Sequence, residues 1–104
     1  MRAFLIDPSQ RVIDPVEFDG TEDGIRGLIG FSTIDSDAIR GGDDRLYFDE
    51  ECFLRATPDS ARFQLDTLAP VSGKGVIVGA DATGESLGPP AISLADLSAR
   101  VRFI

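Results

Sequence analysis

The strongest structural signal in this sequence is a run of three β-branched residues, Val76, Ile77 and Val78, between Gly75 and Gly79. β-Branched side chains favour strands, and successive residues of a strand point to opposite faces of a sheet. A strand that is apolar on both faces is stable only where both faces are covered. The run therefore predicts a central strand with neighbours on both edges and apolar cover over at least one face.

Shorter apolar segments predict the strands around it. Residues 3–6 indicate a short buried strand, and residues 11–18 indicate an edge strand in a hairpin with it, because Pro15 cannot donate to a sheet ladder. Residues 31–34 and 46–48 also read as strands, and the apolar pattern of the second resumes at residues 52–54.

Three segments predict short helices. Thr21 is an expected N-cap residue and Gly30 an expected end for the first helix, residues 60–65 predict a second, and Ser93 is expected to cap a third. The sequence thus predicts a single α+β domain over residues 1–104, with a mostly antiparallel or mixed sheet and two or three short helices. The side chains expected to face the core from the last helix are Leu94, Leu97 and Val101.

The residue types exclude several kinds of site. The chain has no histidine, so Ser-His-Asp and Cys-His catalytic groups and histidine-containing zinc sites cannot form within it. Cys52 is the only cysteine, and no histidine is present to activate its thiol, so we expect a small buried apolar side chain there. We therefore expect no catalytic residue, no metal centre and no cofactor.

The charge balance points to the class of partner. Eighteen acidic residues against ten basic ones give a net charge of −8, which repels phosphate backbones and favours a partner with a basic surface. The single cysteine is typical of a reducing cytoplasm. The apolar run near the N-terminus is too short for a signal peptide, and no run is long enough to span a membrane. We expect a cytoplasmic protein that does not bind nucleic acid or membranes.

Two groups of residues are candidates for ligand binding. The segment 73–79 resembles a nucleotide-binding loop, but the spacing of its glycines fits neither the P-loop nor the dinucleotide fingerprint, so a turn before the central strand is the better interpretation. Lys74, the only lysine, remains a candidate anion contact. The densest group of carboxylates follows a Gly-Gly turn and could approach a ligand or a divalent cation, although its spacing fits no EF-hand. Its candidate residues are Asp43, Asp44, Asp49 and Glu50.

Four segments resemble a known family. These are FLID at residues 4–7, LIG at 28–30, LYFDE at 46–50 and GKGVIVGAD at 73–81. In type and order they resemble a family of small uncharacterised domains carried by phages, plasmids and some bacteria. The resemblance implies a mobile-element context and assigns no role to any residue. Members of that family often carry an asparagine near the position of residues 58–61, and this chain has none.

Three hypotheses for function follow. The first is a non-catalytic acidic interaction protein, of mobile-element origin, that binds a macromolecular partner with a basic surface. The second is a small-molecule or divalent-metal binding domain, or a weak hydrolase, centred on the carboxylates between Asp43 and Glu51. The third is a structural protomer whose edge strand at residues 11–18 pairs in a homo-oligomer.

Overall fold

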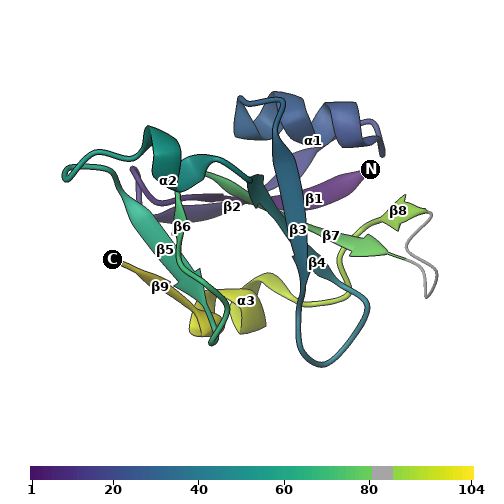
Figure 1. Cartoon of the computed structure of the whole chain (residues 1–104). Coiled ribbons are helices and arrows are strands. Elements are labelled where there is room, and N and C mark those ends of the chain that lie inside the picture. Colours follow the sequence, from purple (N-terminus) through teal and green to yellow (C-terminus); the bar gives the residue numbers. More distant parts are fainter. Residues whose placement is uncertain (81–85) are drawn as a thin grey trace.

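The predicted central strand is β7, Gly75–Ala80, and it lies inside the larger of two antiparallel sheets (Figure 1). β7 pairs with β1 (Arg2–Asp7) on one edge and with β4 (Arg45–Asp49) on the other, which confirms the prediction. The order of this sheet is β2-β1-β7-β4-β3, and the short β8 also pairs with β7. The bounds of these further strands are Val12–Glu17 for β2, Ile34–Ala38 for β3 and Leu87–Gly88 for β8.

The computed structural model describes residues 1–80 and 86–104. Within these residues it contains three helices and nine strands, so the predicted α+β class is confirmed. The turn expected at residues 81–84 lies outside the described residues. No helix in the described part of the chain is long and apolar enough to cross a membrane.

Each face of the larger sheet is covered by a different layer. Val76 and Val78 share an apolar cluster with Ile25 of helix α1. Ile77, which points the other way, shares a cluster with Phe63 of the smaller sheet and Leu97 of helix α3. The three successive buried residues of β7 therefore pack into two different apolar clusters, one on each face of the sheet. The covering elements are α1 (Glu22–Ile29), β5 (Arg62–Leu65), β6 (Val71–Ser72), β9 (Val101–Phe103) and α3 (Leu94–Arg100).

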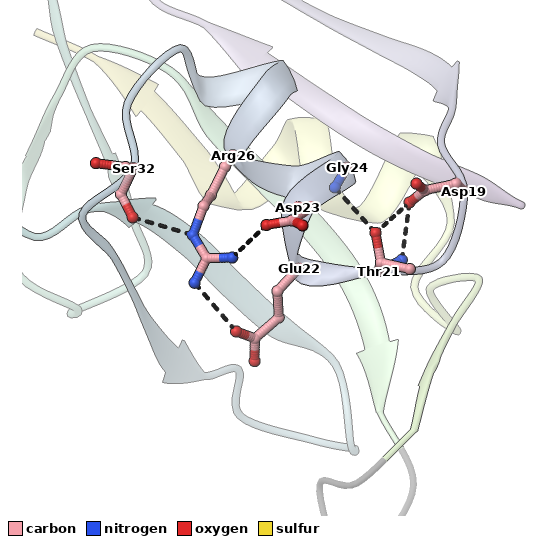
Figure 2. A network of polar contacts seen from close by, with 7 residues as sticks. All are labelled: Asp19, Thr21, Glu22, Asp23, Gly24, Arg26 and Ser32. Atoms are coloured by element: carbon pink, nitrogen blue, oxygen red, sulfur yellow. Dashed lines mark hydrogen bonds and ion pairs between the residues drawn. The ribbon is translucent and has the colours of Figure 1, made fainter.

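Helix α1 begins and ends where the sequence predicts. The Thr21 hydroxyl accepts a hydrogen bond from the Gly24 backbone N–H, which is the expected N-cap geometry. At the other end Gly30 has φ +91°, and its N–H donates to the Arg26 carbonyl. Figure 2 shows that the Arg26 guanidinium then contacts the acids of the first turn and the Ser32 carbonyl, so the helix is fixed to the loop that follows it.

The N-terminal hairpin is also confirmed. β2 pairs with β1 through six residues and is an edge strand of the sheet, with Pro15 opposite Phe4. The N-terminal ammonium donates to the Phe18 carbonyl at 2.9 Å and forms an ion pair with Glu17, which closes the open end of this hairpin.

Four local predictions are wrong. The strand expected over residues 31–34 is β3, which begins only at Ile34 and runs to Ala38. The helix expected over residues 60–65 is strand β5, whose residues are alternately half-buried and buried and pair with β9 and β6. The apolar segment at residues 52–54 lies instead in a one-turn helix, α2, Cys52–Arg55. The last helix ends at Arg100, so Val101 reaches the core from β9, while Leu94 is 37% exposed. For β5 and β9, strand pairing overrides a weak local pattern.

Candidate functional site

A cavity of about 320 Å³ lies where the β1–β2 turn, the end of α1, helix α2 and the β6–β7 connection meet. Parts of the chain far apart in sequence thus form one site. Its charged lining residues are Asp7, Asp49, Arg55 and Lys74; its hydroxyl-bearing ones are Ser9, Ser60 and Ser72; and its larger apolar ones are Pro8, Ile29, Phe31 and Cys52.

The pairing of β1 with β7 places two opposite charges side by side. Ile6 and Gly75 are the last residues in register between these antiparallel strands. Asp7 and Lys74 occupy the next position of the same alignment, at the end where the cavity opens. The sheet order therefore brings one carboxylate and one ammonium to the same wall.

Asp49 is the last residue of β4, and its side chain is 4% exposed. Its carboxylate accepts hydrogen bonds from the Thr33 hydroxyl at 2.5 Å, the Glu51 backbone N–H at 3.1 Å and Nε of Arg55 at 2.9 Å. Burial raises the pKa of the Asp49 carboxyl, but these donors together outweigh it and hold the pKa below its usual value. Asp49 is therefore ionised at neutral pH.

The Asp49 carboxylate holds the Arg55 guanidinium in place beside the cavity. Nη2 of Arg55 donates to Glu51 at 3.1 Å, and the guanidinium carbon lies 4.2 Å from the centre of the Phe31 ring. A guanidinium stacked on an aromatic ring and paired with a buried carboxylate has little conformational freedom. The wall formed by these residues is rigid before any ligand arrives.

Several polar groups of the lining remain unused. Within the described residues the Lys74 ammonium and the Ser72 hydroxyl form no hydrogen bond or ion pair. The Asp7 carboxylate accepts two bonds from Ser9 through one oxygen, at 2.6 and 3.1 Å, and has no cationic partner in the described part of the chain. The free hydrogen-bonding capacity of the cavity thus includes both a cation and an anion.

The carboxylates predicted as one group do not converge. Asp44 is 6% exposed and accepts the backbone N–H groups of Ala91 and Ile92 at 2.9 and 2.8 Å, which holds the segment before α3 in place. Asp43 and Glu50 are exposed and lie away from the cavity. Residues 1–80 and 86–104 contain no group of three or more potential ligands that could hold a metal ion. Of the predicted site residues, Asp49 and Lys74 line the cavity together.

Sequence reasoning missed Asp7 and Arg55 as site residues. Asp7 precedes Pro8 and Ser9, and this motif is typical of a turn, which it also forms. Asp7 is identified as a site residue by its position opposite Lys74. That position depends on the pairing of β1 with β7, which the local sequence around Asp7 does not predict. Arg55 could be recognised as a site residue only if helix α2 were predicted, because this one-turn helix brings Arg55 to Asp49.

Comparisons with protein-family models, with curated proteins and with solved structures found no match to this chain. Four segments that lie apart in the sequence contribute to the cavity lining. They supply Asp7, Ile29, Asp49 and, before the central strand, Gly73 and Lys74.

Proposed function

We propose that this chain is a small-molecule-binding domain whose ligand occupies the cavity between Asp7, Asp49 and Lys74. The proposal keeps the second hypothesis from the sequence and moves its centre from the carboxylate turn to this cavity. The volume lies at the lower end of the range typical of ligand sites, about 300–1,000 Å³. Seven of its fourteen lining residues are charged or carry a hydroxyl group, so the cavity offers polar contacts as well as apolar surface to a ligand.

The observation that carries the proposal is a buried carboxylate, Asp49, paired with the partly exposed Arg55 in the lining that also contains Lys74, a cation with no described partner. Burial of a carboxylate costs desolvation free energy, so such a group is weak evidence for stability alone. Perturbed carboxyl groups in a concave site favour function, because binding sites need rigid, oriented charges. The meeting of four segments that lie apart in the sequence at one cavity is consistent with this interpretation.

The proposed activity is binding rather than a reaction. Cys52 and the three serines line the cavity, but the chain has no histidine to activate a thiol or hydroxyl.

A cavity-filling variant tests the proposal. Ligand-observed NMR and thermal-shift measurements with organic acids, amino acids, nucleosides and sugars should find at least one class that binds the wild-type chain. Ala61→Leu adds three carbon atoms to the lining and should abolish that binding, whereas Ala69→Leu, at an exposed position outside the cavity, should not. The absence of any ligand with a Kd below about 1 mM would overturn the proposal, as would equal binding by Ala61→Leu.

We propose, as a second candidate, the acidic interaction protein: a cytoplasmic accessory protein of mobile-element origin that binds a partner with a basic surface. The net charge of −8 favours it. A purified partner should bind with a Kd that rises steeply with salt, and a partner with an acidic surface would contradict this candidate. The exposed carboxylates that form no ion pair with another described residue are Asp14, Asp19, Asp35, Asp43, Glu50, Asp59 and Asp96.

A further inference from the structure

Four charged side chains line the cavity. Two of them form an ion pair with each other, and the other two have no ion-pair partner among the described residues. Asp49 and Arg55 are joined at 2.9 Å, so together they present little net charge to a ligand. Asp7 and Lys74 form no ion pair with each other or with another described residue, although they occupy facing positions at the ends of β1 and β7. A ligand entering the cavity therefore meets one carboxylate and one ammonium.

We propose that the ligand is a zwitterion of the amino-acid type, with its carboxylate at Lys74 and its ammonium at Asp7. This inference rests on the proposed function and specifies its ligand. An amino acid carries both charges on one carbon, so two protein charges on adjacent strands match its head group. The Ser72 hydroxyl, half-buried and without a described partner, is a further donor to the ligand carboxylate.

The rest of the cavity suits the rest of such a ligand. Ile29, Phe31 and Cys52 provide an apolar surface beside the two charges, which fits an uncharged side chain. The rigid Arg55 guanidinium on the Phe31 ring adds a flat wall on which an aliphatic or aromatic group can pack.

Ligands with only one charge fit less well. A plain carboxylate would bring a second negative charge close to Asp7, which is half-buried and poorly screened. A plain amine would face the Lys74 ammonium. Each mismatch is an unfavourable contact that selects against the wrong ligand, so the two charges give specificity as well as affinity.

Matched ligands test the inference on the wild-type chain, without reliance on any variant. The probes are L-leucine and L-phenylalanine, each with its analogue lacking the amine (4-methylpentanoate, 3-phenylpropanoate) and its analogue lacking the carboxylate (3-methylbutylamine, 2-phenylethylamine). Calorimetry and ligand-observed NMR should show at least one amino acid binding about tenfold or more tightly than either of its analogues.

Two variants then assign the charges. Asp7→Asn should weaken binding of the amino acid and leave that of the amine-free analogue unchanged or improved. Lys74→Gln should weaken binding of both carboxylates and spare the amine. Asp14→Asn, at an exposed site on β2, is the matched control and should change nothing. Circular dichroism checks that each variant is folded.

The outcomes separate the inference from the proposed function. If an amine-free analogue binds as tightly as its amino acid, or if another chemical class binds and both amino acids do not, the zwitterion is wrong and the cavity still binds a small molecule. If no small molecule of any class binds, the proposed function itself fails.

Discussion

Asp49 accepts hydrogen bonds from three segments of the chain: the loop before β3, the residue preceding α2, and α2 itself. Asp49→Asn keeps the shape of the side chain but removes its negative charge. It also replaces one accepting oxygen by an amide NH2 group, which donates and would face the Thr33 hydroxyl or the Arg55 guanidinium. We expect a loss of about 1–3 kcal/mol in the free energy of unfolding, measured by urea denaturation. Glu50→Gln, at the exposed neighbouring position, should stay within about 0.5 kcal/mol of wild type, and an equal loss in both variants would contradict this role for Asp49.

The lowered pKa values predict how stability depends on pH. Hydrogen bonds from Arg100 hold the pKa of Asp66 below its usual value against the opposing effect of burial, and the pKa of Asp49 is also lowered. Such groups bind fewer protons when folded, so their contribution is complete above the unfolded pKa of about 3.9 and is lost as pH falls through the folded pKa. Urea denaturation should give constant stability from about pH 7 to 5.5 and a decline below about pH 5.

The same titration has a variant that checks its cause. Asp49→Asn should make the acid decline shallower, because one of the responsible carboxyl groups is gone. A loss of stability that begins near neutral pH would contradict the prediction, since the chain has no histidine to titrate there.

Two glycines, one in a strand and one in a helix, should respond oppositely to the same substitution. A Cβ on Gly75, in β7, would lie 2.5 Å from Cζ of Phe63 and 2.9 Å from Cδ1 of Leu46, so Gly75→Ala should cost about 1–3 kcal/mol. A Cβ on Gly27, in α1, meets nothing within 4 Å, and Gly27→Ala should add about 0.5–1 kcal/mol through helix propensity. Urea denaturation measures the stability of both variants, and the slopes of the two transitions should stay unchanged. If both variants gained stability, or both lost it, the surroundings described for these two glycines would be wrong.

The elements differ in how far the sequence alone predicts them. β7 and α1 were predictable because their signals are local: a β-branched run in one, and a capping threonine and a terminal glycine in the other. β5 was not, since Thr57 and Pro58 resemble a helix start while its identity as a strand depends on pairing with β9, 36 or more residues away. The candidate site shows the same division. Asp49 and Lys74 stand out in the sequence, but their presence with Asp7 in the lining of one cavity requires the order β1-β7-β4.

At the scale of the whole molecule, the net charge of −8 predicts no binding of duplex DNA at physiological salt. Five basic side chains make no ion pair or hydrogen bond with a described residue, and the acidic side chains of the chain exceed all its basic ones by eight. The five are Arg2, Arg11, Arg40, Arg62 and Lys74. Fluorescence anisotropy with a labelled duplex should therefore show no binding at micromolar protein. Micromolar affinity that weakens steeply with added salt would show that a local basic surface overcomes the overall charge.

The two apolar clusters predict a single unfolding transition. Val76 and Val78 belong to the cluster under α1, and Ile77 belongs to the cluster under the smaller sheet, so neither cluster can lose its packing without disturbing β7. Leu65→Ala, in the second cluster, should lower stability by about 2–4 kcal/mol. Tyr47, the only tyrosine, lies in the first cluster, and its fluorescence reports on the opposite side of the sheet.

In Leu65→Ala the urea midpoints from Tyr47 fluorescence and from far-UV circular dichroism should fall together, because both report the same all-or-none event. Ile25→Ala, in the cluster under α1, is the reciprocal variant and should shift both midpoints in the same way. If Leu65→Ala moved the circular dichroism midpoint and left the Tyr47 midpoint in place, the clusters would unfold separately. β7 would then divide the molecule into two units instead of joining its two cores.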